Sequence, residues 1–217
     1  MNHLDKSYLE KSLSYQEYRK LGQELLEKGT TTNGDNRLEI LEYTNMNMYR
    51  MNRLDKTTKV NENVQHALSN LSSKGNEKYY WVVLTESWCG DAAQIVPVMN
   101  KIAEEAGEKL EIRFLLRDEN PDLIDEFLTN GGRAIPKLIF VKEEKTEKTT
   151  LLKVIGSWGA RPAEAQQLVV DYKEKVKQNP ELEDFKAFSE SLHGWYAKDK
   201  TQHTQNELAE LINKVRS

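Results

Sequence analysis

The stretch TESWCGDAAQ, residues Thr85–Gln94, joins a strand-like run to a helix-like run and contains the single cysteine of the chain. The run before it, YYWVVLT (79–85), is short, continuous and rich in β-branched and aromatic residues, which is typical of a strand buried on both faces. The run after it has helical periodicity up to Gly107, and Pro97 is expected to bend that helix. The sequence therefore predicts that Cys89 lies between a central strand and the N-terminus of a helix.

The segments that follow alternate between strand and helix patterns. Further strands are predicted at residues 110–116, 137–142 and 149–156, and helices at residues 120–132 and 161–178. This alternation predicts an α/β domain built on a mixed central sheet.

Both ends of the chain are expected to be helical. Ser14 and Glu17 have the spacing of a capping box, which predicts a helix start. Two helical segments, 181–197 and 205–215, close the chain. We predict an N-terminal helical extension at 1–57, a central domain at 58–178, and a C-terminal helical extension at 179–217 that packs on the core.

Composition excludes several classes of function. The 217 residues carry 31 basic and 35 acidic side chains, a balance that gives no electrostatic basis for binding nucleic acid or an anionic membrane. No apolar run reaches the roughly 18 residues that a membrane helix needs, and the first residues lack the apolar core of a secretory signal. A single cysteine permits no internal disulfide, so we expect a reducing, cytoplasmic location.

Three short motifs occur in an order that is typical of one superfamily. They are Trp-Cys-Gly at 88–90, Ile-Pro at 135–136 just before a predicted strand, and Val-Ile-Gly at 154–156. Over roughly residues 60–177 the chain resembles the thioredoxin superfamily. The resemblance implies a thioredoxin-like fold with extra helices at both ends, a cis peptide bond before Pro136, and a backbone at Ile135 that pairs with a bound peptide or thiol partner.

The resemblance assigns the candidate site residues. It implies that Cys89 is the catalytic nucleophile. The substrate-binding positions would be Trp88, Gly90, Asp91, Ala92, Ile135 and Pro136.

This chain departs from the dithiol members of the superfamily at coupled positions. In those enzymes a second cysteine releases the bound partner, and Ala92 replaces it here. Val83 stands where those enzymes carry a buried carboxylate, and Phe114 aligns with the lysine that accompanies it. These replacements argue against the ordinary dithiol cycle.

The reactivity of the single thiol depends on its surroundings. A helix N-terminus stabilises a thiolate and can lower a cysteine pKa from about 8.5 to nearer 7. Asp91 and Glu86 should raise the pKa of Cys89, whereas Arg133 and Lys137 would lower it if their side chains point inward. The sequence leaves this balance open.

Three hypotheses follow. The first is a monothiol oxidoreductase in which Cys89 exchanges with protein or low-molecular-weight thiols and disulfides, and an external thiol resolves the adduct. The second is a catalytically inactive thioredoxin-fold module that binds a protein or peptide, with Cys89 as a small buried hydrophobe. The third and weakest is an iron–sulfur carrier, because Asp91-Ala92 replaces the Phe-Ser of glutaredoxins. Neither catalytic activity nor the choice between monomer and homodimer is decided by the sequence.

The histidines give no sign of a metal centre. None of the four is placed at ligand spacing with Cys89, and a zinc site needs three or four convergent ligands. We expect no metal and no cofactor. His193, Trp195 and Tyr196 either pack the terminal helices onto the core or form a partner-binding patch.

Overall fold

The computed structural model describes residues 1–72, 77–145 and 150–216. Its sheet consists of β1 (His3–Leu4), β2 (Tyr79–Thr85), β3 (Leu110–Leu116), β4 (Lys137–Lys145) and β5 (Thr150–Trp158). The helices are α1 (Ser7–Glu10), α2 (Tyr15–Glu27), α3 (Leu38–Thr57), α4 (Glu62–Ser72), α5 (Gly90–Ala106), α6 (Pro121–Asp125), α7 (Ala163–Gln178), α8 (Phe185–Asp199) and α9 (Gln202–Asn213). Short 3₁₀ turns lie at Gly107–Lys109, Pro180–Leu182 and Lys214–Arg216.

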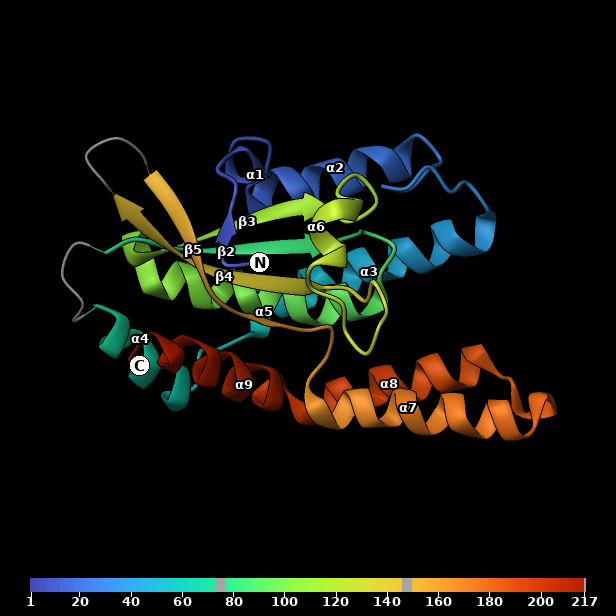
Figure 1. The fold of residues 1–217 in the computed structure, drawn as a ribbon. Helices are drawn as coiled ribbons and strands as arrows, with labels where there is room; N and C mark the ends of the chain where they lie inside the picture. Colours follow the sequence, from blue (N-terminus) through green and yellow to red (C-terminus); the bar gives the residue numbers. More distant parts are fainter. Residues whose placement is uncertain (73–76, 146–149, 217) are drawn as a thin grey trace.

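The strands form one mixed sheet with the order β1-β5-β4-β2-β3. Strand β2 runs parallel to β3 and antiparallel to β4, and β5 and β1 continue the sheet in antiparallel fashion. All seven residues of β2 are buried, as the unbroken apolar run predicted. Helices cover both faces of the sheet, so the predicted α/β thioredoxin-like fold is confirmed (Figure 1).

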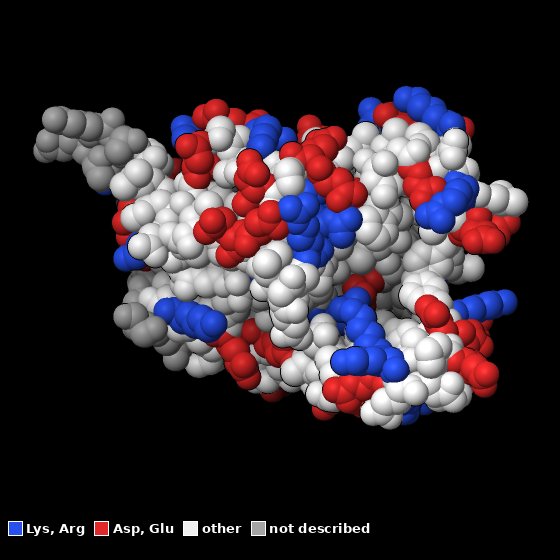
Figure 2. Space-filling model, turned by 45° about the vertical axis from the view of Figure 1, so that its right-hand side comes forward, with Lys and Arg blue, Asp and Glu red and all other residues white. Residues whose placement is uncertain are grey.

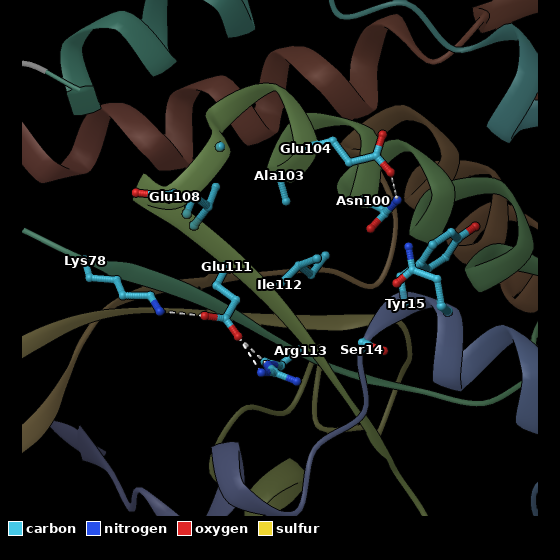
Figure 3. Close-up of a pocket in the computed structure, with 13 residues that line it drawn as sticks. Ser14, Tyr15, Lys78, Asn100, Ala103, Glu104, Glu108, Glu111, Ile112 and Arg113 are labelled. Carbon is cyan, nitrogen blue, oxygen red and sulfur yellow. Dashed lines mark hydrogen bonds and ion pairs between the residues drawn. The ribbon is translucent and has the colours of Figure 1, made fainter.

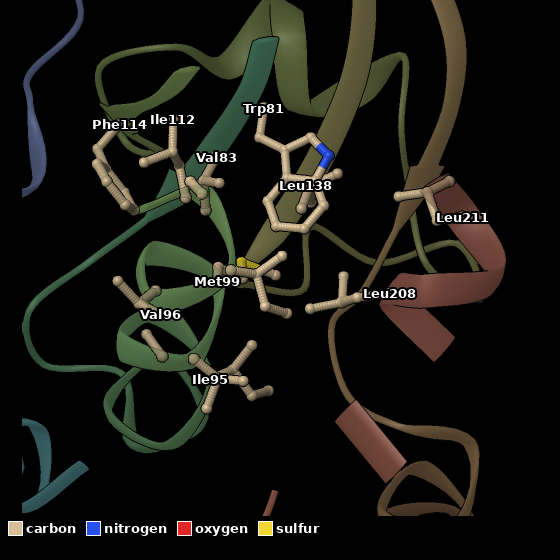
Figure 4. Close-up of a cluster of buried hydrophobic side chains, with 14 of the residues drawn as sticks. Trp81, Val83, Ile95, Val96, Met99, Ile112, Phe114, Leu138, Leu208 and Leu211 are labelled. Carbon is tan, nitrogen blue, oxygen red and sulfur yellow. The ribbon is translucent and has the colours of Figure 1, made fainter. Parts of the chain in front are cut away.

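The core has two layers, one on each face of the sheet. On one face, Trp81 and Phe114 pack against α5 through Met99, and Leu208 and Leu211 of α9 close the same cluster (Figure 4). A smaller cluster on the opposite face joins the other side of β2 and β4 to α6. Cys89 and Ile135 belong to the first cluster, so the site borders the main core.

Both helical extensions contribute to this architecture. The capping box of α2 is present, with the Ser14 and Glu17 side chains bonded to each other's backbone N–H. Helix α3 packs along α5, and α7 and α8 form a hairpin at the lower right of Figure 1. The structure adds a short strand, β1, that the sequence did not predict. The boundaries at 57/58 and 178/179 stay a prediction.

Several predicted elements have different limits in the structure, and the largest difference is in the helix after β3. The helix expected over 120–132 ends at Asp125, and its predicted last turn is excluded because Asn130 and Gly131 adopt φ values of 50° and 76°. A two-residue turn follows, in which Thr129 and Gly132 exchange backbone hydrogen bonds of 2.9 and 3.0 Å. Strand β5 begins at Thr150, and the predicted first residue, 149, lies outside the described residues.

In the described part of the chain, no helix has both the length and the apolar character needed to cross a bilayer. The described residues also bring together no group of three His, Cys, Asp or Glu side chains that could hold a metal ion.

Candidate functional site

Cys89 lies between the end of β2 and the first turn of α5. It is the N-cap residue of α5, and its sulfur accepts a hydrogen bond from the backbone N–H of Ala92 at 3.5 Å. The thiol in turn donates to the backbone carbonyl of Ile135, 3.4 Å away. The Ile135–Pro136 peptide bond is cis. The structure therefore brings together four of the residues that the sequence singled out: Cys89, Ala92, Ile135 and Pro136.

The thiol is protonated in this arrangement. Cys89 is 8% exposed, and burial raises its pKa to about 12, with the nearby Asp91 carboxylate adding to the shift. The backbone N–H of Ala92 and the charge of Arg161 act in the opposite direction and are outweighed. The balance that the sequence left open is therefore decided by burial, which outweighs the effect of the helix N-terminus on the pKa of Cys89.

Asp91 anchors a buried ion pair beside the thiol. Its carboxylate lies 2.6 Å from an Arg161 guanidinium nitrogen and accepts a 2.8 Å hydrogen bond from the Tyr196 hydroxyl. Burial raises the pKa of the Asp91 carboxyl, while Arg161 and Tyr196 both lower it. Asp91 therefore joins the start of α5 to α8 and to the segment that leads into α7. Arg161 was not predicted as a site residue, because no local sequence pattern distinguishes this arginine from a solvated one.

The cations expected to act on the thiol are bound elsewhere. Arg133 forms an exposed ion pair with Asp125, and the Lys137 ammonium donates to the Thr129 hydroxyl at 3.2 Å. Neither side chain opposes Asp91 at the thiol in the way that Arg161 does.

Glu86 and Trp88 flank the cysteine segment on its other side. The Glu86 carboxylate accepts hydrogen bonds from the Thr32 hydroxyl and from the Asp118 backbone N–H. Burial raises the pKa of Glu86. The Arg117 guanidinium lies 5.1 Å from the centre of the half-buried Trp88 ring, which is a cation–π distance.

Helices α3 and α8 cover the cysteine segment. The Tyr43 hydroxyl lies 2.9 Å from His193 Nε2 and 3.3 Å from the Ser189 hydroxyl, and Gln94 holds the other ring nitrogen of His193 at 3.0 Å. A Cβ atom on Gly90 would lie 2.2 Å from the Tyr43 hydroxyl oxygen, so the two are in close contact. We call Tyr43 and His193 the latch.

The latch joins residues 150 positions apart, and sequence reasoning assigned no role to Tyr43. The alternative that the tail residues pack on the core is supported by Tyr196, which is buried, and by Trp195, which packs against the main cluster. His193 is neutral, because burial and the charges of two arginines lower its pKa to about 4.

Replacing Gly90 with alanine should open the latch. The added methyl group would overlap the Tyr43 hydroxyl, which lies at the end of a side chain that can rotate away. Losing one neutral hydrogen bond costs about 1 kcal/mol, so we expect Cys89 to be alkylated about fivefold faster in Gly90→Ala than in the wild type. The rate is read by mass spectrometry of the intact protein.

Gly132→Ala is the matched control. A Cβ there would lie 3.6 Å from the Thr129 carbonyl oxygen, which is an ordinary contact, and the site would be untouched. Equal labelling rates in the two variants would show that the latch does not limit access to the thiol.

A separate groove of about 650 Å³ lies between the first residues of α2, the C-terminal part of α5 and the outer edge of β3 (Figure 3). Its charged side chains include Lys78, Glu111 and Arg113, which form a chain of ion pairs. None of the predicted site residues lines it.

The family model and the curated relatives indicate one family. A family model described as thioredoxin matches residues 35–177. The thioredoxin of Listeria monocytogenes is 33% identical over 93 residues, which cover 42% of this chain and 81% of that protein. The thioredoxin of Bacillus subtilis is 31% identical over 84 residues, covering 39% and 71%. Among solved structures, a protein of unknown function from Pseudomonas aeruginosa covers 94% of this chain and 99% of its own, with 14% identity and a TM-score of 0.48.

Proposed function

Because the chain belongs to the thioredoxin family, we propose that it is a thiol–disulfide exchange protein that uses Cys89 as its single nucleophile. The observation that carries this proposal is the position of the thiol. Cys89 caps α5 and lies against the backbone of Ile135, directly before Pro136. The thiol and the segment that would hold its partner are thus adjacent.

The proposed reaction has two exchange steps. The Cys89 thiolate attacks one sulfur of a disulfide, a mixed disulfide forms, and the other sulfur leaves as a thiolate. A thiolate from another molecule then attacks the partner's sulfur in the mixed disulfide, forms a new disulfide with it and releases Cys89 as a thiolate. The thiolate for the second step must come from another molecule, because the chain has no other cysteine. We propose that Ala92 occupies the position of the resolving cysteine in dithiol relatives. A cytoplasmic, thiol-rich compartment would supply the external thiol.

We propose that the structure represents the resting form of the protein. The Ile135 carbonyl is engaged by the Cys89 thiol, and the latch closes over Gly90. Partner binding would replace the first contact, and exchange would require movement of α3 or α8. Protein or low-molecular-weight thiols and disulfides are the proposed partners. Trp88, Gly90 and Asp91 would shape the approach to the sulfur.

The proposal predicts one adduct per chain that only an external thiol removes. Incubation of the folded protein with hydroxyethyl disulfide should add a single mercaptoethanol by intact mass. The adduct should persist after removal of the reagent and disappear when a low-molecular-weight thiol is added. Cys89→Ser is the blank. Spontaneous release without added thiol would contradict the single-nucleophile mechanism.

A second candidate function is a catalytically inactive binding module. The observation that favours it is the burial of the Cys89 thiol, together with its raised pKa. Such a module would give no adduct on the folded protein. The iron–sulfur hypothesis gains no such support, because clusters are held by several cysteine thiolates and this chain supplies one.

A further inference from the structure

Two arginines on α3 have no carboxylate partner among the described residues. Arg50 and Arg53 are one helical turn apart, and neither forms an ion pair within the described chain. The other arginines with described side chains all do. They are Arg19, Arg37, Arg113, Arg117, Arg133 and Arg161. Arg50 is half-buried, so its charge is partly desolvated and would be stabilised by an anion bound at this position.

Arg50 lies against the latch. Its guanidinium stacks over the Tyr43 ring, 5.2 Å from the ring centre, and donates to the Asn47 side chain at 2.7 Å. The group is half-buried, and burial together with the charge of Arg53 lowers its pKa. The charges of both arginines also reach His193 and help to keep it neutral.

The surroundings supply further donors. The Tyr43 hydroxyl, the Ser189 hydroxyl and the His193 ring meet beside Gly90, where the first turn of α5 presents its positive end. The carboxylate whose charge raises the pKa of Tyr43 is that of Asp91. Asp91 is already paired with Arg161 and does not pair with Arg50. Figure 2 shows that the surface is hollowed between the body of the molecule and the α7–α8 hairpin.

We propose that Arg50 and Arg53, together with Tyr43 and His193, bind a carboxylate of the small thiol or disulfide that exchanges with Cys89. The substrate class rests on the proposed function, whereas the anion site rests on the unpaired arginines. A guanidinium presents two parallel N–H groups that match the geometry of a carboxylate. A carboxylate bound there would also compete with His193 for the Tyr43 hydroxyl, which couples substrate binding to opening of the latch.

The binding test uses Cys89→Ser, so that no exchange can occur, and succinate as the probe. We expect succinate to bind in calorimetric titration, neutral succinamide not to bind, and Arg50→Gln to weaken succinate binding about tenfold. Arg53→Gln should weaken it less, because that side chain is exposed. Circular dichroism shows whether the variants are folded.

Arg37→Gln is the matched control, because it removes the same charge at the start of α3, where Arg37 is paired with Asp35. It should leave succinate binding unchanged. Equal effects of Arg37→Gln and Arg50→Gln, or no binding of succinate, would overturn the site. Binding of inorganic phosphate in preference to succinate would overturn the carboxylate assignment.

An exchange assay on the wild-type protein then tests the substrate class. Release of a Cys89 mixed disulfide should be faster with mercaptosuccinate than with mercaptoethanol at equal thiolate concentration, and Arg50→Gln should abolish the difference. Equal rates in the wild type would overturn the assignment of a carboxylate-bearing substrate. If succinate binds but no mixed disulfide forms at all, the anion site stands and the proposed exchange function fails.

Discussion

Cys89 of the folded protein should be alkylated by iodoacetamide at pH 7 at least about a hundredfold more slowly than the same residue in the urea-unfolded chain. A pKa raised from 9.0 to about 12 reduces the thiolate fraction at pH 7 about a thousandfold. A more basic thiolate is also a stronger nucleophile, which offsets part of the decrease in alkylation rate. Burial of the sulfur then excludes the reagent further.

The pH dependence of the same reaction identifies the cause. The pKa of the thiol is raised, so the logarithm of the rate should climb by about one per pH unit from 7 to beyond 10, without levelling off. Cys89→Ser should give no labelling. An inflection at or below about pH 8.5 would show that the folded protein exposes a stabilised thiolate, which contradicts the resting state described here.

Asp91→Asn should have the largest effect on stability. Removing one charge of a buried ion pair leaves the other uncompensated, which typically costs about 3 to 5 kcal/mol. Arg161 would be that uncompensated charge, although an asparagine can still accept from Tyr196. The free energy of unfolding, measured by urea titration, should fall accordingly. The same change removes the charge that raises the thiol pKa, so the pKa of Cys89 should also fall.

Asp125→Asn provides the comparison. Asp125 pairs with Arg133 at the exposed surface, where ion pairs contribute little. The urea midpoint for unfolding of the Asp125→Asn variant should stay close to that of the wild type. If Asp91→Asn were as stable as Asp125→Asn, the Asp91–Arg161 pair would not be what holds the segment that leads into α7 to the start of α5.

Local sequence patterns predicted the elements whose formation depends on local physics. The apolar run at 79–85 became the fully buried β2, and Ser14 with Glu17 formed the expected capping box. The resemblance carried by Trp-Cys-Gly and Ile-Pro implied that Cys89 and Ile135 belong to one site, and in the structure the thiol donates to the Ile135 carbonyl. Strand β1 escaped prediction, because two residues carry too little pattern and gain their pairing from β5.

The properties of the site depended on contacts that no local pattern records. Two side chains far from Cys89 in sequence contact the cysteine segment. Arg161 lies 72 positions after Cys89, and Tyr43 lies 46 positions before it. These contacts accompany the burial of the thiol. Burial raises the pKa of Cys89 by more than the helix N-terminus lowers it. The position of the thiol was therefore predictable, but its protonation was not.

The central claim is that Cys89 exchanges through local opening of a closed resting form. The most direct test is the rate at which the folded protein reacts with an aromatic disulfide at urea concentrations below the unfolding transition. Local opening exposes little surface, so we predict a rate that is nearly independent of urea in this range. A rate that rises from zero urea with the full slope of global unfolding would mean that the thiol reacts after complete unfolding, and would contradict the proposed exchange function.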